Sequence, residues 1–317
     1  MNIMMTKCPI TYQELSREEK ALGYSYKGLA TLSPSLKALK PLKYTAEQQR
    51  AEGMQRSAKM SIQGVQSKVS ARISIARNEI ELVNTGGRFI IKPQSQFYRL
   101  LPENEDLTMK MAAVVDIETS AHGLIRSIDH TFSYIIKRFD RVSQKSKLAL
   151  EDFAQLSNRN RETKYDSSIE QVIKVIDHYC SFPVVEKMRL FRRLLFCYLT
   201  GNEDMHLKNF SLITRDKKVE LSPAYDLLNT TIAIQGATEE SALPIKGKKK
   251  GITKQLLTKY LASERLQLTE KIISDEIEKI LNAQKEWCDL IKISFLDTEL
   301  KEAYIALLNK RVDVLSS

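Results

Sequence analysis

The sequence has no run of about 18 apolar residues, the length that a helix needs to cross a lipid bilayer. Its first residues also lack the apolar core and small-residue cleavage site of a signal peptide. The four cysteines are scattered, and neither they nor the four histidines have the spacing of metal ligands. We therefore expect a cytoplasmic protein with reduced thiols, no membrane association and no zinc site. The sequence leaves open whether the protein is exported into a host cell.

Acidic residues are fewer than basic ones. The sequence has 39 aspartates and glutamates and 49 lysines and arginines, which gives a net charge of +10. This balance favours polyanionic partners such as nucleotides, nucleic acids or proteins that carry them. The clearest basic run, residues 246–251, contains no aromatic residue, which weakens an interpretation as a single-strand binding surface. A solvated loop and a loop that docks phosphate or substrate both remain open.

The 317 residues suffice for two lobes with a cleft between them. Residues 1–60 are polar and mixed, with helix-forming residues from 45 onward. Alternating or short apolar segments, typical of an antiparallel sheet, lie at residues 68–75, 79–83, 88–93 and 132–139.

A helix is expected over residues 102–121, and apolar residues recur at helical spacing from about residue 150 onward. The pattern predicts an α+β protein with two lobes. Its expected parts are a β-rich N-lobe, a hinge and a helical C-lobe, at residues 1–136, 137–142 and 143–317.

Residues 201–211 read Gly-Asn-Glu-Asp-Met-His-Leu-Lys-Asn-Phe-Ser, and Asp226 follows downstream. Asn209 comes five residues after Asp204, which is the Asp-to-Asn spacing of a protein kinase catalytic loop. In such a site one carboxylate takes the proton of an attacking hydroxyl, while an amide and a second carboxylate hold magnesium on nucleotide phosphates. The spacing therefore predicts Asp204 as the base and Asn209 and Asp226 as magnesium ligands. Lys208 could neutralise charge on the transferring phosphoryl group.

Two weaker signals lie upstream of this motif. The loop at residues 61–68, with Gly64 and Lys68, could contact phosphates through its backbone amides and its lysine, although a plain hairpin turn also fits. Lys92 ends a predicted strand and could meet phosphate oxygens as a point charge, or could simply be solvated. Glu105 could pair with Lys92, or could be only a first-turn acid of the following helix.

Together these segments resemble the HipA family of bacterial serine/threonine kinase toxins, and the chain looks like the family's short HipT branch. The resemblance begins near residue 61. It rests on seven blocks in the same order, at residues 61–68, 89–93, 103–105, 137–141, 151–155, 201–211 and 222–227.

The resemblance implies a protein-kinase-like fold and gives the site residues roles. Asp204, Asn209 and Asp226 keep the roles stated above, and Lys92 contacts the ATP phosphates. The segment of Lys137, Arg138 and Phe139 matches the hinge whose backbone meets adenine. Ser61 matches the autophosphorylated serine of the Gly-rich loop. Gln63 replaces a second serine that the short branch often carries.

The family further implies a toxin–antitoxin kinase that uses ATP and Mg²⁺ and phosphorylates an aminoacyl-tRNA synthetase, which inhibits translation. Tryptophanyl-tRNA synthetase is the favoured target and glutamyl-tRNA synthetase the second. The implied partners are a small HipS-like protein and a DNA-binding HipB-like antitoxin, through which DNA contact would be indirect. A small-molecule phosphotransferase and a non-catalytic kinase-like binding module are the alternatives.

His206, two residues after Asp204, also has two interpretations. It could form an acid/base or metal-binding pair with that carboxylate, or it could be a structural, hydrogen-bonded histidine of the loop.

Overall fold

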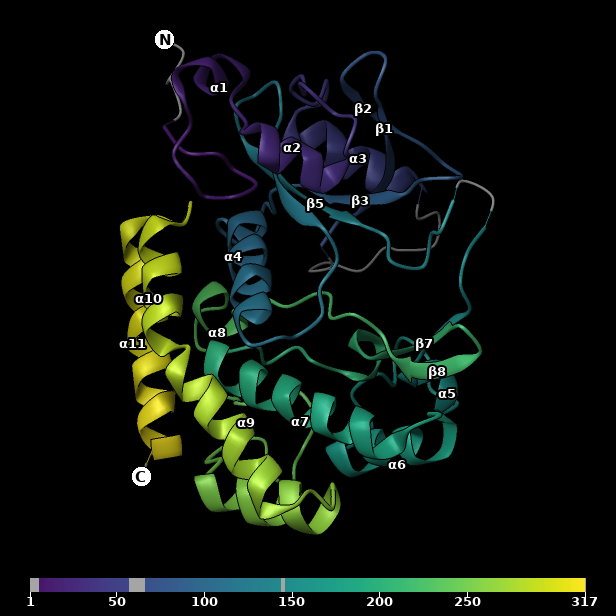
Figure 1. Ribbon diagram of the computed structural model, residues 1–317, viewed down its shortest axis with the longest axis vertical. Helices are drawn as coiled ribbons and strands as arrows, with labels where there is room; N and C mark the ends of the chain where they lie inside the picture. Colours follow the sequence, from purple (N-terminus) through teal and green to yellow (C-terminus); the bar gives the residue numbers. More distant parts are fainter. Residues whose placement is uncertain (1–5, 57–65, 144–145, 317) are drawn as a thin grey trace. The chain divides into compact units, whose positions relative to one another are not determined.

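A computed structural model of the chain describes residues 6–56, 66–143 and 146–316, and it divides into two compact units (Figure 1). Unit 1 comprises Met1–Asp106, Ser120–Lys147 and Ile293–Leu296. Unit 2 comprises Leu107–Thr119, Leu148–Lys292 and Asp297–Ser317. Within the described ranges, no helix is both long and apolar enough to cross a membrane.

Unit 1 is built on an antiparallel five-stranded sheet with the strand order β2-β1-β3-β5-β4. The strands are β1 (Val69–Ser74), β2 (Glu79–Leu82), β3 (Phe89–Lys92), β4 (His122–Arg126) and β5 (Phe132–Lys137). Ile91 in the central strand β3 pairs with Val69 on one side and Ile135 on the other. The alternating segments of the sequence thus form the predicted sheet, and β4 is a strand that the sequence pattern did not predict.

The core of unit 1 includes residues that the sequence analysis treated only as polar and mixed. Helices α1 (Arg17–Leu22), α2 (Tyr26–Leu32) and α3 (Ala46–Arg56) precede the sheet. Leu29 and Leu32 of α2, and leucines of the coil before α1 and after α2, are buried together with Ala71, Ile91 and Ile135 of the sheet. The leucines escaped notice because they are spread over short helices and coil, and no long periodic run marks them.

Helix α4 (Leu101–Val114) is shorter than the helix expected over residues 102–121. The chain leaves the helix at Asp116, which has a left-handed φ of 56°, and then enters β4. The beginning of α4 belongs to unit 1, and the rest belongs to unit 2. In unit 2, Trp287 donates a hydrogen bond from Nε1 to the Met111 carbonyl at 2.8 Å and so fixes this part of the helix.

Unit 2 is mainly helical, as predicted, and is arranged around α7 (Pro183–Thr200), which contacts α6, α9 and α11 (Figure 1). Its other helices are α5 (Phe153–Leu156), α6 (Ile169–Tyr179), α8 (Thr230–Ala233), α9 (Glu270–Asn282), α10 (Gln284–Ile293) and α11 (Thr298–Ser316), with the 3₁₀-helix η1 (Leu207–Asn209) and the π-helix η2 (Leu256–Arg265).

A small antiparallel sheet of unit 2 has the strand order β6-β7-β8. Its strands are β6 (Leu150–Asp152), β7 (Ser211–Arg215) and β8 (Lys218–Leu221). The predicted catalytic stretch runs from the end of α7 into β7, and Asp226 follows β8. Because β7 and β8 are antiparallel, the predicted catalytic stretch before β7 and Asp226 after β8 lie at the same end of this hairpin. The mixed α/β architecture confirms the predicted fold class.

Candidate active site

The catalytic stretch begins where Gly201 ends helix α7. Its φ of 73° is left-handed, and a Cβ atom there would lie 2.5 Å from Oδ1 of Asn229. Only glycine combines that conformation with so close an approach. The Gly201 carbonyl accepts hydrogen bonds from the amides of Thr230 and Thr231 at 2.9 and 3.1 Å. The loop that follows is therefore anchored at its first residue.

Asn202 links the two acidic segments. Its Oδ1 accepts a hydrogen bond from the Asp204 amide at 3.1 Å, and its Nδ2 donates to the Asp226 carbonyl at 3.5 Å. Asn202 is 1% exposed, and both hydrogen bonds are partly buried. One buried amide thus sets the backbone positions of both predicted acids.

The Asn209 side chain is bound to the catalytic stretch through one of its two polar atoms. Its Nδ2 donates to the Asp204 carbonyl at 2.8 Å, which leaves its amide oxygen as the atom that can face a cation. Tyr225, next to Asp226, donates from its hydroxyl to the Lys208 carbonyl at 2.9 Å. An amide oxygen and a carboxylate suit Mg²⁺, which takes few protein ligands beside substrate phosphates.

No cluster of three or more His, Cys, Asp or Glu side chains that could hold a metal ion occurs among the described residues. The predicted magnesium ligands, Asn209 and Asp226, are not such a cluster, because they are only two residues and one of them is an amide.

Asp204 is 44% exposed and contacts two aromatic side chains. The Tyr165 hydroxyl donates a hydrogen bond to Asp204 Oδ1. The His206 ring packs edge-on against the Tyr165 ring, with centroids 5.0 Å apart. His206 Nε2 lies 3.9 Å from Asp204 Oδ1, beyond hydrogen-bonding distance. Burial lowers the pKa of His206, against the opposing charge of Asp204, so the ring is a neutral, packed group.

The structural interpretation of His206 fits the packing of its ring against Tyr165. Its Nδ1 is buried and has no hydrogen-bond partner within the described part of the chain.

Two lysines lie near the acids. Lys208 Nζ is 2.6 Å from Oδ2 of Asp152, the N-cap of α5, so its charge is already partly compensated. Burial lowers the pKa of Lys164, and the charges of Asp204 and Asp226 act in the opposite direction. Both acids therefore lie within electrostatic range of Lys164, a residue outside the predicted site.

In unit 1, Lys92 is buried and paired. Its Nζ lies 2.6 Å from Glu105 Oε1, and the two side chains are 7% and 0% exposed. Lys92 is therefore not a solvated lysine. Glu105 pairs with it, as one of the two interpretations of Glu105 predicted. A buried lysine held by a glutamate of the following helix is a fixed positive charge at the end of β3.

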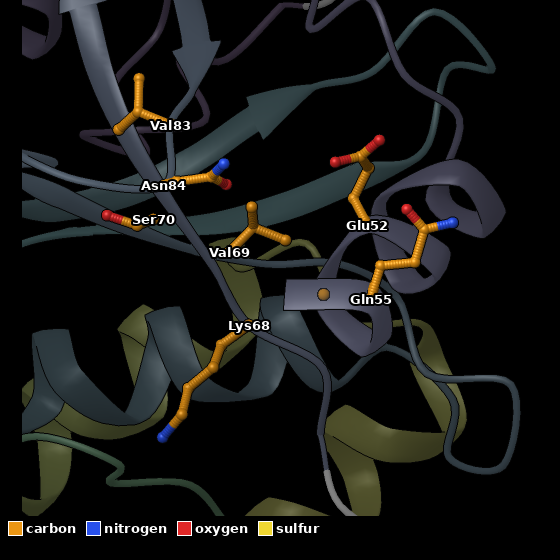
Figure 2. Close-up of a pocket in the computed structure, with 8 residues that line it drawn as sticks. Glu52, Gln55, Lys68, Val69, Ser70, Val83 and Asn84 are labelled. Atoms are coloured by element: carbon orange, nitrogen blue, oxygen red, sulfur yellow. The ribbon is translucent and has the colours of Figure 1, made fainter. Parts of the chain in front are cut away.

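The predicted phosphate loop is only partly described. Ser61 and Gly64 lie outside the described residues. Lys68 lines a cavity of about 610 Å³, together with residues of α3 and β1 and with Asn84 after β2. Figure 2 shows the Lys68 side chain extending away from the other labelled residues.

The predicted hinge continues β5 at its end. The amides of Lys137 and Arg138 donate to the carbonyls of Ala121 and Arg88, each at 2.8 Å. The Arg138 guanidinium donates twice to the Asp140 carboxylate, at 3.0 and 2.9 Å. The backbone amides of Lys137 and Arg138 therefore already have hydrogen-bond acceptors within unit 1. Phe139 is the next residue of the predicted hinge.

The chain belongs to the family of HipA-like C-terminal domains, whose family model matches residues 60–287. It is 29% identical over 239 residues to a Haemophilus influenzae protein named "Putative kinase", covering 72% of this chain and 69% of that one. It is 34% identical over 272 residues to the Sinorhizobium fredii protein "Putative kinase Y4dM", covering 80% of this chain and 64% of that one.

Two solved structures share the fold. HipA of Shewanella oneidensis MR-1, in a complex with HipB and its operator DNA, matches with a TM-score of 0.68 at 20% identity and covers 89% of this chain and 76% of its own. The Helicobacter pylori proinflammatory kinase CtkA matches with a TM-score of 0.54 at 17% identity and covers 77% of this chain and 91% of its own. The predicted HipA-like family and kinase-like fold are thus confirmed.

Sequence reasoning missed the residues that connect the site. Asn202 lies two residues before Asp204. A polar amide side chain so close to the predicted base was the signal that could have identified it. Tyr165 and Lys164 lie about forty residues upstream of Asp204 in a segment without a periodic pattern, and nothing in the sequence joins them to the acid. Only the fold brings them together.

Proposed function

We propose that this protein is an ATP-dependent serine/threonine protein kinase of a toxin–antitoxin system. Asp204 accepts the proton of the acceptor hydroxyl, and Asn209 and Asp226 hold Mg²⁺. Lys92 contacts nucleotide phosphates, and Lys208 assists charge neutralisation at the transferring group. The magnesium ion, when bound, would neutralise charge on the phosphates.

The observation that carries the proposal is the bonding of Asn202 to both acidic segments. Because its amide holds the Asp204 and Asp226 backbones at once, base and metal ligand are fixed relative to each other before any substrate binds. Relatives named as kinases, and the likeness of the fold to a kinase structure, support the same reaction class.

We further propose, from the family resemblance, an aminoacyl-tRNA synthetase as substrate, with the tryptophanyl enzyme preferred and the glutamyl enzyme second, and inhibition of translation as the effect. The proposed partners are a HipS-like protein and a HipB-like antitoxin, and the proposed location is the cytoplasm. The HipA of the Shewanella structure is bound to HipB and operator DNA, which supports an antitoxin partner. Autophosphorylation at Ser61, together with adenine contact by the backbone of residues 137–139, completes the proposal.

The test measures transfer of labelled phosphate from ATP to purified synthetases by wild type, Asp204→Asn and Asp226→Asn. Asp216→Asn is the matched control, because this exposed acid lies in the β7–β8 turn at a left-handed φ that asparagine tolerates. We expect both site variants to lose transfer by roughly 10²-fold or more, and the control to keep it. Equal incorporation by Asp204→Asn and wild type would remove Asp204 as the base. Label on an aminoglycoside or sugar, with none on protein, would instead indicate a small-molecule phosphotransferase.

A further inference from the structure

Tyr165 follows a hydrogen-bonded turn in the connection between α5 and α6. Asn160 Oδ1 accepts hydrogen bonds from the amides of Glu162 and Thr163, at 2.9 and 3.0 Å. The Asn160 amide donates back to Thr163 Oγ1 at 3.0 Å, which closes the turn. The Lys164 carbonyl then accepts a hydrogen bond from the Leu207 amide at 3.3 Å. The segment is thus locked internally and tied to the loop that carries Asp204.

The Tyr165 side chain contacts three other side chains, those of His206, Lys164 and Asp204. Its ring meets the His206 ring edge-on, and the Lys164 ammonium lies 4.9 Å from the centroid of the Tyr165 ring. The hydroxyl donates to Asp204 Oδ1. Burial raises the pKa of Tyr165 well above its usual range, and the hydrogen bond to Asp204 and the charge of that carboxylate raise it further. The phenol therefore keeps its proton and remains a donor.

A carboxylate that acts as a base needs only one oxygen for the acceptor hydroxyl. We propose that Tyr165 is a positioning residue that holds Oδ1 of Asp204, so that the other carboxylate oxygen, Oδ2, faces the acceptor hydroxyl. The inference rests on the proposed kinase function and adds to it a residue outside the motif. The Asp204 amide is held by Asn202, so the residue is fixed at its backbone by one neighbour and at its side chain by the other.

A rival interpretation is that Tyr165 masks the base and must swing away before the acceptor enters. The contacts oppose it, because a rotation of the Tyr165 side chain would release its edge-on contact with the His206 ring, its contact with the Lys164 ammonium and its hydrogen bond to Asp204. The two interpretations predict opposite results when the hydroxyl is removed. Tyr165→Phe keeps the ring and its packing but deletes the donor.

The kinetic test compares Tyr165→Phe with wild type in the full chain, with ATP and purified tryptophanyl-tRNA synthetase as probes. Autophosphorylation serves as a second readout. We expect kcat to fall about 10- to 100-fold, the range for a misaligned catalytic group, with the KM for ATP within roughly twofold. Tyr179→Phe is the matched control, because Tyr179 is 42% exposed against 40% for Tyr165 and lies at the end of α6. Its kcat should not change.

A double substitution shows whether Tyr165 acts through Asp204. In the Asp204→Asn background, Tyr165→Phe should cause no further loss, because there is no base left to orient. Multiplied losses in the double variant would overturn the proposal, as would an unchanged kcat in Tyr165→Phe. A raised kcat would also overturn it, in favour of a mask.

A second measurement does not depend on activity. A fluorotyrosine placed at position 165 is titrated by ¹⁹F NMR in wild type and in Asp204→Asn. Because the Asp204 charge helps to raise the pKa of Tyr165, that pKa should fall in Asp204→Asn. An unchanged pKa would show that the contact does not exist in solution, which overturns this inference alone. A wild-type protein that transfers no phosphate, with the contact intact, would overturn the proposed function instead.

Discussion

The buried Lys92–Glu105 pair gives the sharpest stability prediction. The two charges are 2.6 Å apart and both side chains are buried, so their attraction at an effective dielectric constant of about 20 is roughly 6 kcal/mol. The cost of removing both charges from water offsets much of this attraction. Removing one partner leaves the other charge buried, which costs about 3–5 kcal/mol. We therefore expect Glu105→Leu to lower the free energy of unfolding by that amount.

The assay is thermal unfolding of wild type, Glu105→Leu, Lys92→Met and the double variant. For a chain of this size the single variants should lose roughly 6–12 °C in midpoint. The double variant should recover part of the loss because neither charge remains. Lys40→Met is the matched control, since Lys40 pairs with Glu79 at 3.1 Å but is 61% exposed, and its loss should stay below about 1 kcal/mol.

The result that would refute this reasoning is simple additivity. If the double variant lost as much as the two single variants together, the charges would not be coupled, and the short contact would carry no net energy. Measuring ATP binding by the same four proteins distinguishes an effect on stability from an effect on function. The double variant should be folded but should bind ATP weakly, because the proposed phosphate-contacting charge is gone.

Three further predictions concern other parts of the chain. Gly201→Ala should destabilise by more than about 3 kcal/mol, whereas Gly236→Ala, with a φ of 79° and open space around it, should cost only about 1–2 kcal/mol in thermal unfolding. Burial raises the pKa of Glu103 to about 7, so the folded state holds an extra proton between pH 4.5 and 7 and stability falls as pH rises through that window. Glu103→Gln should flatten this fall in unfolding curves taken from pH 5 to 8. Asp152→Asn keeps an N-cap for α5 but removes the ion pair with Lys208. The free energy of unfolding should change by less than about 1 kcal/mol, whereas kcat should change. Unchanged kcat would show that the ion pair has no catalytic role.

The strands of the unit 1 sheet other than β4 were predictable because apolar residues alternate with polar ones or form short apolar runs in the sequence. Residues 79–83 were read as a strand, and β2 covers Glu79–Leu82. The first helix was missed although its signal was present. Ser16 and Glu19 form a capping box around α1, and the Ser-x-x-Glu spacing is visible in the sequence. Without a long apolar run behind it, that signal was too short to stand out.

The sequence predicts candidate site residues, whose roles remain proposals, but not the contacts that hold most of them. Asp204 and Asn209 share one loop, so their spacing alone suggested their roles. The partner of Lys92 stayed open, because Glu105 is equally suited to the first turn of a helix and only the packing decides. Tyr165 could not be found at all, because its hydrogen bond to Asp204 depends on how the α5–α6 connection folds back.

The charged groups of the proposed reaction differ in how they are fixed, and the difference follows from what must reach them. Lys92 is buried against Glu105, so its charge is in place before a nucleotide binds and costs no reorganisation later. Asp204 is 44% exposed, as the proposed role requires, because the acceptor hydroxyl would have to reach it. Its orientation is instead fixed by two hydrogen bonds: the Tyr165 hydroxyl donates to its carboxylate, and its own amide donates to Asn202 Oδ1. Changes around Lys92 should lower stability and activity together, whereas the loss of the Tyr165 hydroxyl should lower kcat and leave the fold intact.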